Sequence, residues 1–191
     1  RSYLGGYPIK AVVTVDWGGR PCDYAAIRAA APGIAIIQDA AHCLGRLPDF
    51  PNDRGDYVAW SFQAIKFLTT GDGGGLLVPE PQRRRGRLLR WFGLDRESRE
   101  SFRCEQDIAE AGFKYHMNNL AAALGLLQLP PLPGLLQAHR DNSFFYDEHI
   151  VQRERVDALW KDVDRSQSSC WLHTLLVRDR EAFVAHMAAK G

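Results

Sequence analysis

An acid, a hydroxyl and a lysine follow stretches of this sequence that have the composition of buried strands. Asp39 ends one such stretch, and His42 comes three residues later. Ser61 ends the next, with Lys66 five residues on and a glycine-rich turn, Gly71–Gly75, close behind. In a parallel α/β sheet, ligands bind at the carboxyl ends of the strands. We therefore expect these side chains to share one site.

These groups match the needs of a pyridoxal-phosphate (PLP) site. A lysine forms a Schiff base with the cofactor's aldehyde, and a carboxylate keeps the pyridine nitrogen protonated, so that the ring remains an electron sink. A hydroxyl and backbone N–H groups hold the phosphate. Each residue also has an ordinary structural explanation, because lysines after strands are usually on the surface, an aspartate often caps a helix, and Ser61 can cap a turn. The residue types alone leave both explanations open.

The elements that would position these residues follow from hydrophobic and turn patterns. Strand, helix and strand at residues 11–15, 22–31 and 34–37 form a βαβ unit, with Asp23 as the helix N-cap, so this part of the sheet is expected to be parallel. The other expected strands lie at 57–61, 76–78 and 169–177. The other expected helices lie at 81–92, 117–129 with Asn118 as cap, 137–153 and 180–190.

Composition narrows the class of protein. The chain has 191 residues, 46% hydrophobic and 25% charged, which is normal for a globular protein. A net charge of +1 favours neither nucleic acid nor an anionic membrane as a partner, and the apolar runs are too short to span a bilayer. The four cysteines are widely separated and show no zinc-ligand spacing, so we expect no metal, and a cytoplasmic location.

One basic cluster stands out, at Arg83, Arg84, Arg85, Arg87 and Arg90. It has two explanations, a patch that binds phosphate or nucleic acid and the solvated face of an amphipathic helix. The apolar residues that follow favour the helix face.

At three segments the sequence resembles the DegT/StrS family of PLP-dependent sugar aminotransferases. Gln38-Asp-Ala-Ala-His-Cys-Leu-Gly45 resembles the family's Glu-Asp-Ala-Ala-(Gln/His)-x-x-Gly. Ser61-Phe-Gln-Ala-Ile-Lys-Phe-Leu-Thr-Thr-Gly-Asp-Gly-Gly74 resembles its Ser-Phe-x-x-x-Lys-x-x-x-x-Gly-(Glu/Asp)-Gly-Gly. Gly112-Phe-Lys-Tyr-His-Met-Asn-Asn-Leu-Ala-Ala-Ala-Leu-Gly125 resembles its Gly-Tyr-(Asn/Lys)-(Tyr/Phe)-(Arg/His)-Met-x-x-x-x-Ala-Ala. The segments occur in family order, and the similarity runs from about Lys10 to the end of the chain.

The resemblance implies a fold-type I PLP-dependent transferase: part of the large domain, with a mainly parallel sheet, and the start of a small C-terminal domain. We expect a partial PLP-binding large domain at residues 1–135, and a linking helix with the beginning of the small domain at 136–191. Both ends look cut, because the first residues run almost directly into a core strand and the last helix ends at the final glycine. The chain therefore resembles an internal piece of a family member.

The resemblance also implies roles. Lys66 would carry the Schiff base and act as the base that moves the proton, Asp39 would pair with the pyridine nitrogen, and His42 would lie beside the ring. Ser61 would bind the phosphate, and Lys114 would reach the phosphate of the partner subunit in a homodimer with shared active sites. At position 114 many members have Asn, and His116 replaces a more frequent Arg. Gln38 replaces the common Glu, from which we expect little effect.

The implied reaction moves an amino group from an amino acid, with glutamate the expected donor, to a nucleotide-linked keto-sugar. A sugar dehydratase that uses PLP or pyridoxamine phosphate is a weaker alternative, because such members have His where this chain has Lys66. A third alternative, from a different class, is an incomplete or non-catalytic chain. The tryptophans are assigned to packing, with Trp17 the exception to watch because it follows Asp16 at a strand's carboxyl end.

Overall fold

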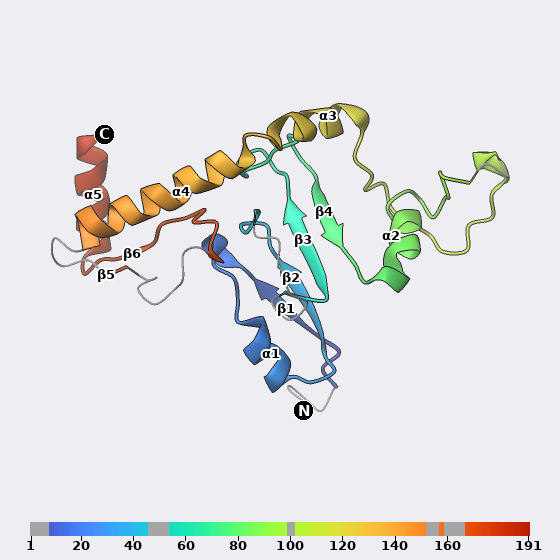
Figure 1. Cartoon of the computed structure of the whole chain (residues 1–191), viewed down its shortest axis with the longest axis horizontal. Helices are drawn as coiled ribbons and strands as arrows, with labels where there is room; N and C mark the ends of the chain where they lie inside the picture. The colour runs from blue at the N-terminus through green and yellow to red at the C-terminus, as the bar shows by residue number, and fades with distance from the viewer. Residues whose placement is uncertain (1–7, 46–53, 99–101, 152–156, 159–166) are drawn as a thin grey trace.

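A computed structural model of the chain describes residues 8–45, 54–98, 102–151, 157–158 and 167–191. Its centre is a four-stranded sheet with the order β1-β2-β3-β4 (Figure 1). The strands β1 (Ala11–Val15), β2 (Ala35–Asp39) and β3 (Tyr57–Ser61) are parallel, and β4 (Gly74–Leu77) is antiparallel to β3. The mixed, mainly parallel sheet confirms the predicted α/β class.

The first crossover follows the local sequence signals. A short 3-10 turn, η1 (Trp17–Gly19), leaves β1, and the helix α1 (Tyr24–Ala30) leads back to β2. The carboxylate of Asp23 accepts a hydrogen bond from the backbone N–H of Ala26 at 2.9 Å, so Asp23 is the predicted N-cap. Ile36 is completely buried, which anchors this unit.

The glycine turn was placed slightly wrongly by the sequence pattern. Gly74 and Gly75 belong to β4, where they pair with Ser61 and Trp60. A Cβ atom on Gly74 would collide with the carbonyl oxygen of Trp60, so glycine is required by the close approach of the two strands. The turn itself is made by the residues before Gly74, including Gly73 at φ +120°.

Seven further helical elements lie in the described part of the chain after β4. They are η3 (Glu80–Gln82), α2 (Arg83–Leu89), η4 (Arg103–Glu105), α3 (Asn119–Gln128), α4 (Leu132–Tyr146), the π-helical turn η5 (Asp147–Val151) and α5 (Arg180–Lys190). The carboxamide of Asn118 accepts from the N–H of Ala121 at 2.9 Å, which confirms the predicted cap of α3.

Two helix boundaries differ from the prediction. The helix expected at 137–153 begins at Leu132, because Pro133 lies in its first turn, where a missing N–H costs nothing. Its expected last residues, 152 and 153, lie outside the described residues. The helix expected at 81–92 ends at Leu89, and the chain turns at Gly93, whose φ is +82°.

The strand expected at 169–177 is wrong over most of its length. The described strand there, β6, comprises Leu175–Leu176 and pairs antiparallel with β5 (Asp157–Ala158). The preceding residues donate backbone hydrogen bonds to η1 instead, from Ser169 to Gly19 and from Leu172 to Gly18. Hydrogen bonds to η1, which is distant in the sequence, therefore replace the strand pairing that the local pattern predicts for these residues.

Two of the helices pass along one end of the sheet. In Figure 1, α3 and α4 run across the end at which β3 finishes, α5 lies at the far end of α4, and α2 lies on the opposite side of the sheet. Ala40, Cys43 and Val58 form a buried cluster. No single described helix is long and apolar enough to cross a membrane, although α3 and the helical stretch Leu132–Ile150, bent by 58°, meet the length and composition criteria together.

The basic cluster is a charged helix face. Four of its arginines form ion pairs with carboxylates around α2: Arg83 with Glu80 (2.6 Å), Arg84 with Asp95 (3.6 Å), Arg85 with Glu110 (2.6 Å) and Arg87 with Glu97 (2.7 Å). These ion pairs agree with the solvated-face explanation of the sequence pattern.

Candidate active site

Asp39 lies at the end of β2, on the edge of the sheet where the parallel strands finish. Its backbone carbonyl accepts from the N–H of Asp16 at 2.9 Å, and the next residue, Ala40, donates to Ala59 at 2.8 Å. One carboxylate oxygen accepts from the N–H of Ala41 at 2.9 Å. These bonds hold the Asp39 carboxylate on the short loop that leads to His42.

His42 is held by the loop that follows β1. The backbone N–H of Gly18 donates to Nδ1 of His42 at 3.2 Å, so this nitrogen is unprotonated and Nε2 carries the proton of the neutral ring. The imidazole is stacked on the indole of Trp171, with ring centroids 4.0 Å apart and an angle of 22°. Trp17 contacts the same imidazole edge-on at 5.0 Å.

The charges nearest His42 are those of the other predicted site residues. Burial lowers the pKa of His42 below its ordinary value of 6.5, and the positive charge of Lys66 lowers it further, whereas the carboxylate of Asp39 acts in the opposite direction. Asp39 and Lys66 therefore both lie within electrostatic reach of His42.

Lys66 lies on the turn that follows β3. Its backbone N–H donates to the carbonyl of Gln63 at 2.9 Å, which fixes the turn. The ammonium nitrogen lies 4.3 Å from the ring centroid of Trp171. Lys66 and His42 thus contact the same indole, although they come from different loops.

Ser61 ends β3 and caps a turn, which is the structural role that its residue type allows. Its hydroxyl oxygen accepts from the N–H of Gln63 at 3.3 Å, which caps the turn that carries Lys66. A hydroxyl that accepts one hydrogen bond can still donate its own proton, so capping and phosphate binding are compatible.

Lys114 lies between η4 and α3, and its described contacts are with Trp91, just after α2. It forms an isolated bridge with Trp91, and its ammonium lies 5.5 Å from the Trp91 ring. His116 lies edge-on to the same ring at 3.6 Å, and burial together with Lys114, Arg96 and Arg90 lowers the pKa of His116. Within this chain, no described contact joins Lys114 to the other four predicted site residues.

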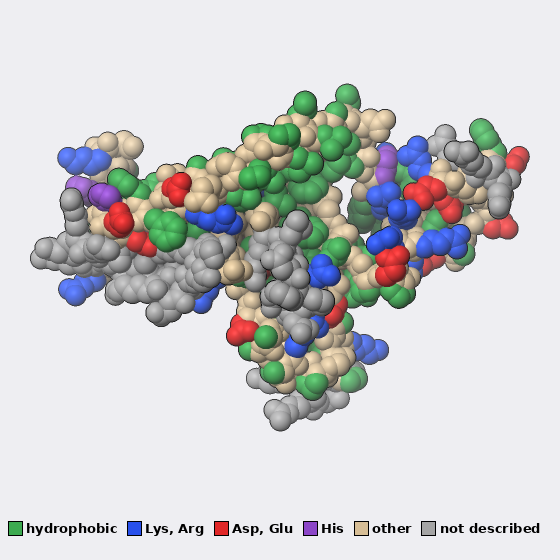
Figure 2. Space-filling model, in the orientation of Figure 1, with side chains coloured by type: hydrophobic (Ala, Val, Ile, Leu, Met, Phe, Trp, Pro, Cys, Tyr) green, Lys and Arg blue, Asp and Glu red, His purple; other side chains and the backbone are tan. Residues whose placement is uncertain are grey.

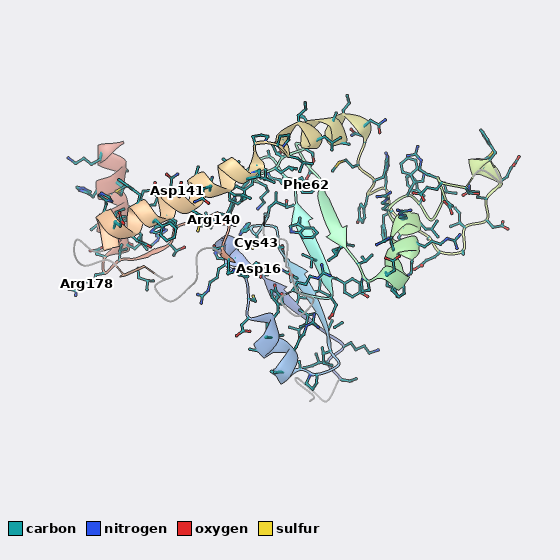
Figure 3. All side chains as sticks on the ribbon, in the orientation of Figure 1. Asp16, Cys43, Phe62, Arg140, Asp141 and Arg178 are labelled. Atoms are coloured by element: carbon teal, nitrogen blue, oxygen red, sulfur yellow. The ribbon has the colours of Figure 1, made fainter. Side chains whose placement is uncertain are left out.

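Beneath the site is a buried polar network centred on Asp16, which is completely buried. Its carboxylate accepts from the N–H of Cys22 (3.0 Å), the hydroxyl of Tyr24 (2.6 Å) and the amide of Gln38 (2.6 Å). Asp16, Cys43 and Arg140 lie around the same end of the sheet (Figure 3). The network joins the ends of β1 and β2, and thereby supports the loop that carries Asp39.

The amide of Gln38 matters more than the sequence comparison suggests. Its oxygen accepts from the N–H of Gly55 at 2.9 Å while its nitrogen donates to Asp16. An ionised glutamate can accept from Gly55 but cannot donate to a carboxylate. The expectation of little effect from Gln in place of Glu is therefore corrected by these two bonds.

Trp171 is the site residue that sequence reasoning missed. Like the other tryptophans, it was assigned to packing, and nothing in its local pattern marks it. Trp17, which was singled out for its place after Asp16, does lie at the site, against His42, with 64% of its surface exposed. No group of three or more His, Cys, Asp or Glu side chains in the described ranges could hold a metal ion.

The mainly parallel sheet, with Asp39 at the end of β2 and His42 and Lys66 on the loops that follow β2 and β3, agrees with the fold of the fold-type I PLP-dependent transferases. The sequence model of the DegT/DnrJ/EryC1/StrS aminotransferase family matches residues 7–191, and the chain belongs to this family.

Two solved structures and a further sequence relative agree with this membership. AtS13 from Actinomadura melliaura is 33% identical, with a TM-score of 0.82 over 95% of this chain and 51% of its own. The sugar aminotransferase CalS13 from Micromonospora echinospora is 30% identical, with a TM-score of 0.79 over 94% of this chain and 51% of its own. The uncharacterized protein MJ1066 of Methanocaldococcus jannaschii is 28% identical over 76% of this chain and 40% of its own. The chain thus spans about half the length of these relatives.

Proposed function

We propose that this chain supplies the lysine-bearing half-site of a PLP-dependent aminotransferase that transfers an amino group from glutamate to a nucleotide-linked keto-sugar. The observation that carries the proposal is that Lys66 and His42, on the loops after β3 and β2, contact the same indole, while Asp39 ends β2 three residues before His42. Membership of the aminotransferase family, and similarity to the sugar aminotransferase CalS13, support the reaction class and the sugar acceptor.

The side chains present fit the cofactor. Asp39 offers a carboxylate for a protonated ring nitrogen, Lys66 offers an amine for an aldehyde, and Ser61 offers a hydroxyl for the phosphate. When bound, PLP supplies an electron sink that weakens the C–H bond next to the amino group. The carboxylate of Asp39 keeps that sink effective by holding the ring nitrogen protonated.

The residues of the chain then have separate tasks. Lys66 holds the cofactor and, once released from it, takes the proton from the donor's Cα and returns it at another carbon as general base and acid. His42 would lie beside the ring, and burial and the charge of Lys66 lower its pKa, which favours the neutral imidazole. Ser61 binds the phosphate and, through Gln63, holds the turn of Lys66 in place.

The position of Lys114 supports a homodimer with shared sites. In this chain Lys114 lies beside Trp91, away from Lys66, so it would act on the phosphate of the partner subunit as a point charge. α3 exposes apolar side chains that a partner would cover, among them Leu120 (85% exposed), Leu126 (65%) and Leu127 (78%). Figure 2 shows hydrophobic side chains gathered along α3 and α4.

The location follows from the same chemistry. The four cysteines are widely separated in the sequence and do not suggest a disulfide framework. A chain without such a framework suits a reducing compartment, and we place the protein in the cytoplasm. The dehydratase alternative is disfavoured because Lys66 stands where those enzymes carry His.

Absorption spectroscopy tests the proposal. The chain is mixed with PLP, freed of excess and recorded in the visible range, beside Lys66→Ala and the exposed-lysine control Lys10→Ala. We expect a bound-cofactor band in the parent and in K10A that is lost in K66A, and glutamate should bleach it. A folded parent without a band would mean that this half of the family's length does not bind PLP alone.

A further inference from the structure

The segment 168–172 is seated on the loops of the active site by buried hydrogen bonds. The hydroxyl of Ser168 donates to the carbonyl of Gly19 at 2.8 Å, and the hydroxyl of Ser169 donates to the carbonyl of His42 at 2.6 Å. Both serines are almost completely buried, with 2% and 1% of their surfaces exposed. Backbone N–H groups of Ser169 and Leu172 donate to the same glycine loop. The segment is thus fixed at the site at several points.

This seating directs Trp171 at the reactive groups. Cys170, directly before it, has φ +51°, a conformation uncommon for a residue other than glycine, and only 8% of its surface is exposed. The Trp171 indole then lies nearly parallel to His42 and places its ring centroid 4.3 Å from the ammonium of Lys66. An ammonium within about 6 Å of an indole face is attracted by the ring's quadrupole.

We propose that Trp171 is a positioning residue of the active site, which holds the amino group of Lys66 by a cation–π contact and the ring of His42 by stacking. The inference rests on the proposed function, because it concerns the lysine that the reaction uses. Lys66 must stay near the reacting carbons when it is not joined to the cofactor, and the indole face gives its ammonium a fixed place. A hydrocarbon side chain of similar size would fill the space without holding the charge.

The test is made on the chain without cofactor. Lys66 is acylated by a small amine-reactive reagent, and its rate of modification is followed by peptide mass spectrometry, with Lys10 as internal reference. Trp171→Leu and Trp171→Met should raise the rate at Lys66 by about two- to thirtyfold, because they remove the aromatic face that holds the ammonium. Trp171→Phe keeps a ring face and should stay within about threefold of the parent.

Trp17→Leu is the matched control. It is the same substitution beside the same imidazole, but Trp17 contacts His42 through its edge and is largely exposed. The rate at Lys66 should remain within about twofold. Equal rates in W171L and W17L would overturn the proposal, as would equal effects of W171L and W171F. Loss of the fold in both W171L and W171M would assign Trp171 to packing alone, and overturn it too.

NMR titration of His42, assigned with His42→Gln, gives an independent signal. Since burial and Lys66 lower its pKa, and Asp39 alone among its described charged neighbours raises it, removal of the stacked indole in W171L should bring the pKa up toward 6.5. An unchanged titration would contradict the stacking role. Neither measurement needs bound PLP, so a parent that fails to bind the cofactor would contradict the proposed function without deciding the role of Trp171.

Discussion

The side-chain amide of Gln38 donates a hydrogen bond to the buried carboxylate of Asp16, with 2.6 Å between Nε2 and Oδ2. Because the amide oxygen also accepts from Gly55, one side chain connects β2, the end of β1 and the segment before β3. Gln38 directly precedes Asp39 in the sequence, so this hydrogen bond helps to fix the strand end that carries the candidate cofactor carboxylate.

Gln38→Glu should therefore destabilise the fold. The substitution places a second carboxylate against Asp16 in a buried position, and we expect a loss of about 1–3 kcal/mol in the free energy of unfolding at neutral pH. The loss should shrink in acid, where a shared proton can replace the amide hydrogen. Urea unfolding at pH 5 and pH 8 measures both effects. Gln63→Glu is the control, because the exposed side chain of Gln63 accepts its described hydrogen bond, from the N–H of Ile65, and a carboxylate can accept it as well. Equal losses in both variants would refute the argument.

Tyr24→Phe tests the same network from the other side. The Tyr24 hydroxyl donates to Asp16 at 2.6 Å, and its loss should cost about 1.5–3 kcal/mol, as expected for a bond to a charged acceptor. Tyr115→Phe, which alters a side chain with 75% of its surface exposed, should cost little.

The alkaline stability of the protein should depend on Tyr24. Burial, and then the hydrogen bond to Asp16, raise the pKa of Tyr24 above its ordinary value of 10.0. A raised pKa contributes stability that is fully present below pH 10 and is lost as the pH rises beyond it. The parent should therefore lose stability above pH 10 more steeply than Y24F in thermal unfolding curves. Parallel curves for the two proteins would contradict this assignment.

Much of the fold could be predicted because its signals are local. Asp23 and Asn118 cap their helices through bonds to the residue three positions later, so these helix starts can be predicted from the local sequence. The strands β1 and β3 can be predicted from their own apolar residues. The start of α4 was expected at residue 137, five residues too late, although a proline such as Pro133 is compatible with the first turn of a helix. The residues before β6 were misplaced because their hydrogen bonds go to η1, which no local pattern announces.

The same distinction applies to the candidate site. Asp39, His42, Ser61 and Lys66 follow directly from strand ends and motifs. Trp171 could not be found this way, because its contacts with His42 and Lys66 exist only after the segment 168–172 has docked. Residues placed by long-range packing carry no periodicity or spacing of their own, and only coordinates reveal them.

The titration of His42 should respond in opposite directions to its two charged neighbours. Lys66→Met removes a positive charge and should raise the pKa of His42, whereas Asp39→Asn removes the opposing negative charge and should lower it. A folded pKa below the ordinary 6.5 means that His42 contributes stability above pH 6.5, which is lost as the pH falls through the lowered value. K66M should reduce this acid loss. NMR titration checks both shifts, with Lys10→Met as control, and shifts of the same sign in K66M and D39N would contradict the arrangement.

Gly19→Ala should weaken the docking of segment 168–172. Gly19 has φ +91°, and a Cβ atom there would collide with the hydroxyl of Ser169 and lie 3.0 Å from the backbone nitrogen of Trp171. Gly33→Ala is the matched control, because Gly33 also has a positive φ, +75°, but a Cβ atom there meets nothing within 4 Å. Both variants bear the backbone strain, so the difference between their free energies of unfolding isolates the collision, for which we expect about 1–3 kcal/mol.

G19A should also raise the rate of acylation of Lys66, since displacement of the segment withdraws Trp171 from it. Equal stabilities of G19A and G33A, with no change at Lys66, would mean that the contact between η1 and this segment does not hold the site together.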